Sequence, residues 1–415
     1  MQALRIGLLL GFRQIQRANL WTTSLIIFVM ALTFMNLIAV SGILVGLIAG
    51  SERALQEKSL GDIIVTPLDN EDTILETDTF ARELAQLPEI ASYSIRYKTS
   101  ASVEANYKTR RDFSKDANIV TGRFIGIDPL HEDAVTKLSE NVVEGEYLDP
   151  TEEGYLLLGA LTIDRYTAGF ADITGSLENI YPGDTVRVTS NGNTKEFVVK
   201  GIVDAKAGEV SSGIYIPERE LRRLSGRIDR NAEEIAIRLV SPDTAVETKS
   251  TLLALGLADH AKIRTFNEAI PKFVVDIKNT FNILGVFIGA IGIIVASITI
   301  FIIIFINAVS RQRQIGILKG IGIERRVIEV AYILQAAFYA IVGSAIGVLI
   351  TYGFLVGYFD RNPIDFPFSD GILVAEPLST LYRFLILFGV TLVAGFLPAW
   401  LIVKKNTLNS ILGRK

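Results

Sequence analysis

Four long stretches of the chain contain no Asp, Glu, Lys or Arg, and they constrain the fold more than any other feature. They cover residues 18–51, 279–310, 330–359 and 384–403, and each is rich in Leu, Ile, Val and Phe. A helix needs roughly 20 apolar residues to cross the hydrocarbon core of a bilayer, so each stretch is long enough. We therefore predict an integral membrane protein with four transmembrane helices.

The charges that flank these stretches predict the orientation. Lys and Arg outnumber acidic residues before the first stretch, between the second and third, and after the fourth. Acidic residues predominate in the short segment after the third stretch. Because cytoplasmic loops carry the excess of Lys and Arg, we expect both termini and the loop at 310–327 to be cytoplasmic. Residues 51–276 and 360–380 are then expected outside.

The N-terminal segment allows two interpretations of the first span. That span is far longer than the roughly 7–15 apolar residues of a cleaved signal peptide, which favours an uncleaved signal anchor. Residues 1–19 combine Arg5, Arg13 and Arg17 with apolar residues. This composition suits a basic amphipathic helix that lies on the inner membrane face.

The segment 51–276 is too long for a loop and predicts a folded α+β domain outside the cytoplasm. It contains 26 Lys and Arg against 39 Asp and Glu, a local net charge of −13. The turn at 191–193 between two alternating runs predicts a β-hairpin, and Asp128-Pro129 predicts a helix start. Residues 234–266 resemble a β-α-β unit, and 267–278 are expected to be helical and to continue into the second span.

No catalytic or ligand-binding constellation stands out in the sequence. There is no cysteine, the two histidines stand apart, and the phosphate-binding pattern Gly-x-x-x-x-Gly-Lys-Ser/Thr does not occur. We expect no enzyme activity, no cofactor and no metal site in this chain, and no nucleic-acid partner. The charge-free stretches also argue against ion-coupled transport, which usually places ionisable residues at membrane depth.

Glycines recur at four-residue spacing in the spans and allow close helix packing. In the first span these are Gly42, Gly46 and Gly50. Similar spacing joins Gly285 to Gly289 and Gly343 to Gly347. Packing within one chain and a seam between two copies are equally compatible with this pattern, and the first helix is the better candidate for a dimer seam.

The segment 310–329, with the sequence SRQRQIGILKGIGIERRVIE, is the most informative. Ile315, Leu318 and Ile321 fall on one helical face, and Gly320 and Gly322 allow a sharp turn before the third span. Such a short amphipathic helix can rest on the membrane or insert into a groove of a cytoplasmic partner.

This motif resembles that of the FtsX/MacB/LolC-type ABC permeases, the mechanotransmission family, whose pattern reads roughly R-x-R-E-I-G-[IV]-L-[RK]-A-[IL]-G. The Pro398-Ala399 pair and the placement of the large domain are similar to that family as well. Gln314 stands where the family usually has Glu, and residues 406–412 lack its usual proline. The resemblance implies a bacterial inner-membrane permease without a fused ATPase, whose outside domain is similar to the MacB periplasmic core domain.

The resemblance also implies partners and a layout. The partners would be a cytoplasmic ABC ATPase that carries ATP and Mg, a second permease copy or paralogue, a periplasmic adaptor or carrier, and membrane lipids. Residues implied in ATPase coupling are Arg311, Arg313, Gln314, Ile315, Gly316, Leu318, Lys319 and Gly322. The layout is an amphipathic helix at 1–19, spans at 20–50, 277–309 (with a stalk), 328–359 and 381–403, the outside domain at 51–276, the coupling helix at 310–327, an outside loop at 360–380, and a cytoplasmic tail at 404–415.

Three functions remain as hypotheses at this point. The first is ATP-driven export or extraction of an amphiphile such as a lipoprotein, lipid, peptide or antibiotic, which the size of the outside domain favours by resemblance. The second is a non-transporting transmitter that controls a cell-envelope hydrolase or sensor. The third, a membrane-anchored enzyme, is disfavoured because no catalytic set is present.

Overall fold

The computed structural model describes residues 2–17, 19–108, 117–167, 175–362, 364–366, 369–371 and 373–404. The chain divides into two compact units. We call the first, residues 1–48, 276–365 and 371–415, the membrane bundle. The second, residues 49–275 with 366–370, is called the large domain.

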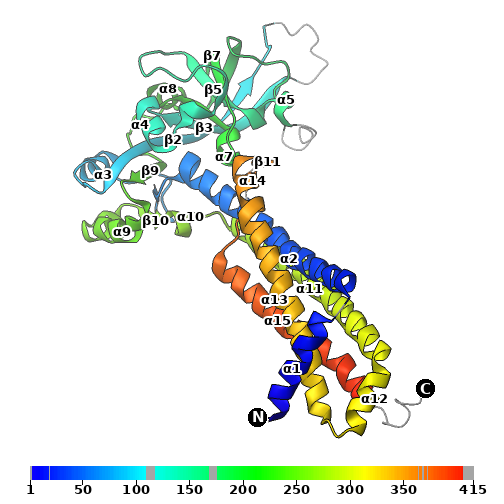
Figure 1. Cartoon of the computed structure of the whole chain (residues 1–415). Coiled ribbons are helices and arrows are strands. Elements are labelled where there is room, and N and C mark those ends of the chain that lie inside the picture. Colours follow the sequence, from blue (N-terminus) through cyan, green and yellow to red (C-terminus); the bar gives the residue numbers. More distant parts are fainter. Residues whose placement is uncertain are drawn as a thin grey trace. The chain divides into compact units, whose positions relative to one another are not determined.

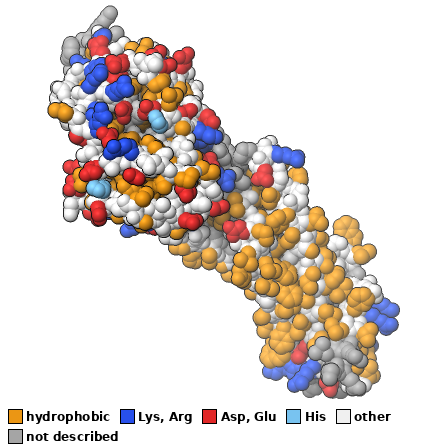
Figure 2. Space-filling view, turned by 90° about the vertical axis from the view of Figure 1, so that its left-hand side faces the viewer, with side chains coloured by type: hydrophobic (Ala, Val, Ile, Leu, Met, Phe, Trp, Pro, Cys, Tyr) orange, Lys and Arg blue, Asp and Glu red, His pale blue; other side chains and the backbone are white. Residues whose placement is uncertain are grey.

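Four helices in the described residues are long and apolar enough to cross a membrane, which confirms the predicted spans. They are α2 (Leu20–Leu55), extended by the π-helix η1 (Gln56–Leu60); α11 (Lys272–Ser310); α13 (Arg325–Ile350), extended by η6 (Thr351–Leu355) and α14 (Val356–Arg361); and α15 (Pro377–Val403). They lie side by side in the bundle (Figure 1). Figure 2 shows hydrophobic side chains over most of the visible bundle surface, whereas the large domain presents mixed charges.

Close backbone approach at glycines holds parts of the bundle together. A Cβ atom added at Gly343 of α13 would lie 2.4 Å from the Cβ of Met30 on α2. The N-terminal helix α1 (Gln2–Gln16) packs against α13 in the same way, because Gly7 and Gly11 face it closely. Leu9 and Phe12 of α1 stay exposed, so α1 is both part of the bundle and an apolar surface.

The large domain is a mixed α/β unit. Its strands are β1 (Ile63–Thr66), β2 (Ile90–Glu104), β3 (Ile119–Ile127), β4 (Val142–Gly145), β5 (Tyr155–Gly159), β6 (Thr185–Ser190), β7 (Asn193–Val203), β8 (Gly213–Pro217), β9 (Glu234–Leu239) and β10 (Lys262–Thr265). Its helices of eight or more residues are α3 (Thr77–Leu84), α4 (Pro129–Thr136), α8 (Glu218–Ser225) and α9 (Ala245–Ala254). Shorter ones are α5 (Asp164–Thr167), α7 (Gly208–Ser211), α10 (Phe266–Ala269) and the 3₁₀ turns η2 (Leu138–Asn141), η3 (Ala160–Thr162), η4 (Pro242–Thr244) and η5 (Leu257–Asp259).

Two sheets share the long strand β2. Residues 90–96 of β2 pair with β9 in the order β10-β1-β9-β2, and the core beneath includes Phe80 and Leu252 of α3 and α9. Residues 97–104 of β2 belong instead to a closed ring, β2-β3-β8-β5-β7-β6, because β6 pairs with both β2 and β7. The interior of this ring is filled by side chains such as Phe124 and Phe197. The strand therefore passes from one sheet to the other at Arg96 and Tyr97.

Local sequence signals account for several of these elements. The predicted hairpin is confirmed, since β6 and β7 pair antiparallel around Asn191 and Gly192, which both have positive φ. Asp128 caps α4 by accepting from the backbone N–H groups of Leu130 and His131. The expectation of one continuous helix from 267 was wrong: α10 ends at Ala269 and α11 begins at Lys272. Pro271 explains this break, because proline disfavours helical backbone in the residue before it.

Candidate partner-docking segment and buried polar sites

The predicted coupling segment forms a short helix and a turn. Helix α12 (Gln312–Gly320) follows α11 after Arg311, and α13 begins at Arg325. Gly322 adopts φ +93°, a left-handed conformation that glycine tolerates without strain. The backbone N–H of Ile323 donates to the carbonyl of Leu318 (3.0 Å) and closes the turn.

The apolar residues of this segment point in two directions. Ile315 is only 4% exposed and belongs to the bundle core, and Leu318 packs against the same core. Ile317 and Ile321 are 50% and 72% exposed. Of the three residues predicted to share a helical face, Ile315 and Leu318 therefore pack against the bundle, whereas Ile321 is exposed.

The residues available to a partner are thus only part of the predicted set. Arg313 and Gln314 are exposed, as is Ile317. Arg311 and Lys319 are half-buried, and Gly316 is buried. Gly322 is exposed in the turn. The outward surface, which we call the docking face, consists of Arg313, Gln314, Ile317 and Ile321.

Cations attach this segment to the end of α15. Lys319 Nζ donates to the carbonyl of Val403 (3.1 Å), and Arg325 Nη2 lies 3.4 Å from the carbonyl of Trp400. Lys404 Nζ lies 4.9 Å from the centroid of the Trp400 ring. Positive charge is favourable at the unpaired carbonyls of a helix C-terminus, so these contacts stabilise the packing of the segment against the end of α15.

The glycines proposed for a dimer seam are used at least partly within the chain. A Cβ at Gly42 would lie 2.8 Å from a Leu373 side-chain atom, and the Gly42 carbonyl accepts from the N–H of Val374. Gly46 is buried and Gly50 is half-buried. Gly42 thus makes close contacts within the chain, and the dimer seam at these glycines stays a prediction.

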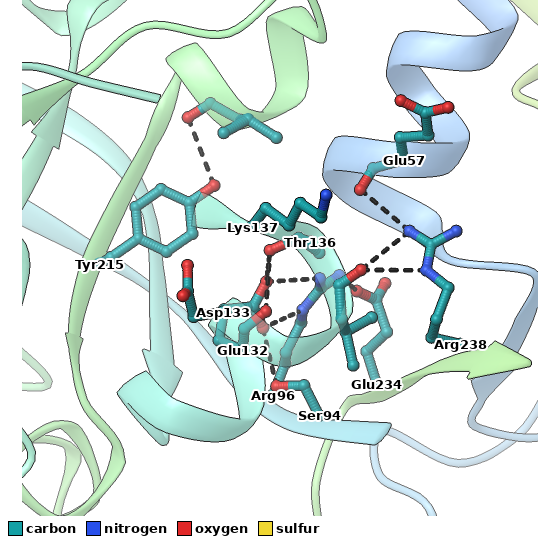
Figure 3. A network of polar contacts seen from close by, with 12 residues as sticks. Glu57, Ser94, Arg96, Glu132, Asp133, Thr136, Lys137, Tyr215, Glu234 and Arg238 are labelled. Carbon is teal, nitrogen blue, oxygen red and sulfur yellow. Dashed lines mark hydrogen bonds and ion pairs between the residues drawn. The ribbon is translucent and has the colours of Figure 1, made fainter. Parts of the chain in front are cut away.

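A buried network of charges lies where β2 changes sheets (Figure 3). Arg96 donates through Nε and Nη2 to both carboxylate oxygens of Glu132 on α4 (2.9 and 2.7 Å) and through Nη1 to Glu234 on β9 (2.8 Å). Ser94 and Thr136 donate to the same Glu132 carboxylate, at 2.7 and 2.9 Å. Every donor nitrogen of Arg96 is thereby used.

The pKa values in this network follow from the pairing. Burial alone would raise the pKa of Glu234, but the charges of Lys98 and Arg96 lower it to about 2. Burial also opposes ionisation of Glu132, yet Arg96 keeps its pKa below the ordinary value. Both carboxylates are thus ionised and already hydrogen-bonded to side chains of the domain, so neither is available as a general acid or base.

Another buried carboxylate, that of Asp62, lies just after η1. Asp62 is fully buried, accepts from Gln56 Nε2 (2.8 Å) and from the N–H of Leu239 (2.8 Å), and pairs with Arg238 (3.3 Å). Arg238 also donates to the carbonyls of Gln56 and Glu57 and to that of Val135 on α4 (Figure 3). Arg238 therefore joins the end of the α2–η1 helix to α4, the helix that carries Glu132.

One charged residue, Arg383, lies inside the fourth span, whose predicted bounds of 381–403 already include it. The charge-free stretch begins at residue 384, but α15 already begins at Pro377, so Arg383 lies inside the helix. The Pro377 start after Glu376 was the available signal, since proline is favoured in the first turn of a helix. In the described residues, no group of three or more His, Asp or Glu is placed to hold a metal.

Four membrane-spanning helices with a large mixed α/β insertion after the first define this chain as a polytopic membrane protein. Comparison with known proteins then finds a family match for part of the chain. Residues 286–407, which include the docking face, match the family FtsX-like permease C-terminal. The chain carries an FtsX-like permease domain.

Relatives of known name agree with this assignment. The chain is 26% identical over 206 residues to the macrolide export ATP-binding/permease protein MacB of Campylobacter jejuni, covering 48% of this chain and 30% of that protein. It is 28% identical over 144 residues to the ABC transporter permease YtrF of Bacillus subtilis, covering 32% of each. The alignments thus span about a third of the length of these relatives.

Solved structures of outside domains are also similar to part of the chain. The periplasmic region of MacB from Actinobacillus actinomycetemcomitans aligns with a TM-score of 0.35 and 14% identity, covering 51% of this chain and 92% of that one. The extracellular domain of the transporter YknZ from Gram-positive bacteria aligns with a TM-score of 0.33 and 14% identity, covering 49% and 98%.

Proposed function

We propose that this chain is the permease subunit of an ATP-driven ABC complex in a bacterial inner membrane. It would export or extract an amphiphilic cargo, such as a lipoprotein, lipid, peptide or antibiotic. The name of the MacB relatives, macrolide export proteins, supports an export role. In this proposal both termini and the docking face are cytoplasmic, and the large domain lies outside.

The observation that carries the proposal is the docking face. Two large apolar side chains are exposed, Ile317 on α12 and Ile321 in the turn that follows, and Arg313 of α12 is exposed as well. Exposed apolar residues with a polar rim are typical of protein-binding sites. A separate ABC ATPase that carries ATP and Mg would bind there, and the complex would contain a second permease copy or paralogue.

Movement would reach the large domain through two continuous helices. Helix α2 passes from the bundle into residues of the large domain, where Arg238 joins η1 to α4. Helix α11 begins near the end of the large domain's chain and ends at the docking segment. Closure of the ATPases would thus displace the outside domain, which would hand cargo to a periplasmic adaptor or carrier.

The test is co-purification of the full chain with an ABC ATPase encoded beside it. The double variant Ile317→Asp/Ile321→Asp removes the apolar part of the docking face without touching the core, so it should lose the ATPase and stay folded. Ile228→Asp is the matched control, because Ile228 is 95% exposed in the large domain. Retention of the ATPase by the double variant would reject the docking face.

A further inference from the structure

Arg383 is a charged residue inside the membrane-spanning helix α15. It is the seventh residue of α15, about 9 Å along the axis from the start at a rise of 1.5 Å per residue. It is half-buried, and the described remainder of α15 up to Val403 contains no other Asp, Glu, Lys or Arg. An ionisable residue within a membrane helix is costly and usually serves a function.

The partners of Arg383 in the described residues do not neutralise it. Its Nη2 donates to the hydroxyl of Ser41 on α2, a neutral acceptor. No carboxylate of the described residues forms an ion pair with it, although Glu376 acts on it from a distance. Glu376 is itself exposed and accepts a hydrogen bond from Ser379 (3.0 Å). Of the five N–H donors of the guanidinium, most therefore have no acceptor among the described residues.

Small and hydroxyl-bearing residues surround this position. A Cβ added at Gly285 of α11 would lie 3.9 Å from Ser41 Oγ, so α11 leaves room beside the Ser41 hydroxyl. The hydroxyls of Tyr352 and Thr380 bond one another at 2.9 Å, and Thr380 shares the face of Arg383 at a spacing of three residues. The site thus offers one cation and additional hydroxyl groups.

Apolar side chains continue from the site along the same helix. Leu381, Tyr382 and Leu385 are each more than half exposed. An acyl chain would contact such a surface favourably, while a phosphate group would match the planar guanidinium in a bidentate manner. The guanidinium of Arg383 is oriented toward Ser41 on the neighbouring helix α2, which an arginine solvated only by water would not require.

We infer that Arg383, assisted by Ser41, binds the phosphodiester head group of an anionic membrane lipid at the end of the bundle where α2 enters the large domain. The acyl chains of that lipid lie along the exposed apolar face of α15. This site does not depend on the docking face or on the proposed export function.

The experiment is native mass spectrometry of the full chain in neutral detergent, titrated with phosphatidylglycerol. Wild type should retain the lipid, and Arg383→Gln should bind it at least about tenfold more weakly, as expected for the loss of a charge-assisted contact. Arg361→Gln is the matched control, since Arg361 is exposed at the end of α14, and its binding should equal that of wild type. Equal binding by Arg383→Gln and wild type would overturn the inference.

Two further arms separate the sources of the anion and guard against misfolding. Diacylglycerol lacks the phosphate and should not be retained, whereas glycerol phosphate lacks the chains and should bind far more weakly than the lipid. Glycerol phosphate binding as tight as that of the lipid would overturn the lipid assignment. If Arg383→Gln does not fold, Ser41→Ala removes a hydroxyl without burying a new group and should lower affinity severalfold; unchanged affinity in that variant would reject the site.

Discussion

The two units each contain an arginine with reduced access to water, buried at Arg96 and half-buried at Arg383, and the partners of the two differ. Arg96 of the large domain has both its carboxylate partners within the chain, and every nitrogen of its guanidinium donates at 2.7 to 2.9 Å. Arg383 of the bundle has one neutral protein acceptor, Ser41. Burying a charge is tolerable only where it is paired and hydrogen-bonded. The large domain therefore meets that requirement by itself, whereas the described residues of the bundle offer Arg383 no carboxylate as an ion-pair partner.

The largest effect is expected from breaking the Arg96 network. Arg96→Met leaves Glu132 and Glu234 buried without this counter-charge, and removal of one partner of a buried pair costs about 3–5 kcal/mol. We expect urea unfolding of the full chain in detergent to show this loss, with hydrogen exchange of the β2 and β9 amides as the readout. In Arg223→Met, the lost pair with Glu153 joins side chains 66% and 60% exposed, so stability should change little. Equal effects of the two variants would mean that the network is not a source of stability.

A smaller effect should come from the bundle, where close packing replaces ion pairing. In Gly343→Ala the new methyl group would meet the Met30 Cβ at 2.4 Å, so the helices must separate. Overpacking of this kind costs about 1–3 kcal/mol, measured as a lower thermal unfolding midpoint in detergent.

The control for this packing prediction is Gly389→Ala on α15. Nothing lies within 4 Å of a Cβ placed there, and alanine favours a helix over glycine by about 1 kcal/mol. The thermal unfolding midpoint of Gly389→Ala should therefore equal or exceed that of wild type. A fall of the same size in both variants would show that helix propensity, not helix contact, determines the result.

Some of this architecture was predictable because its signals are local. Spans follow from runs of apolar residues, and the hairpin at Asn191 and Gly192 follows from residues that adopt positive φ. The direction of an amphipathic face is not local: the spacing of Ile315 and Leu318 showed that they share a face, but only the bundle determines that this face looks inward. The same limit applies to β2, whose change of sheet at Arg96 depends on partners more than 130 residues away, such as Glu234.

The sequence also could not show which arginine side chains pair with carboxylates in the fold. Arg96 and Arg383 are identical in sequence terms, each preceded and followed by aromatic or apolar residues. Their partners in the fold distinguish them: Arg96 pairs with Glu132 and Glu234, whereas Arg383 donates to the hydroxyl of Ser41. The charge-free stretch begins only at residue 384, whereas the predicted span 381–403 and helix α15 both include Arg383.

The smallest predicted effect is a pH dependence confined to the large domain. The pKa of Glu234 is lowered from 4.5 to about 2 in the folded protein. A carboxyl with a depressed folded pKa stabilises the fold above its unfolded pKa, and this contribution is lost as the pH falls through the folded value. We therefore expect the protection of β2 and β9 amides from hydrogen exchange to decline between about pH 4.5 and pH 2, while amides in the middle of α13 change little.

Lys98→Met sharpens this pH prediction, because Lys98 is the stronger of the two cations acting on Glu234. Its removal raises the folded pKa of Glu234 toward the ordinary value. One pKa unit corresponds to about 1.4 kcal/mol, so the variant should be less stable by about 1 kcal/mol near pH 7. Its stability should also decline less steeply on acidification, and the two proteins should converge near pH 2. Lys108→Met, whose pair with Glu196 joins side chains 57% and 52% exposed, should keep the wild-type profile of the β2 and β9 amides. A constant difference between Lys98→Met and wild type at every pH would instead assign the effect of Lys98 to packing of its side chain.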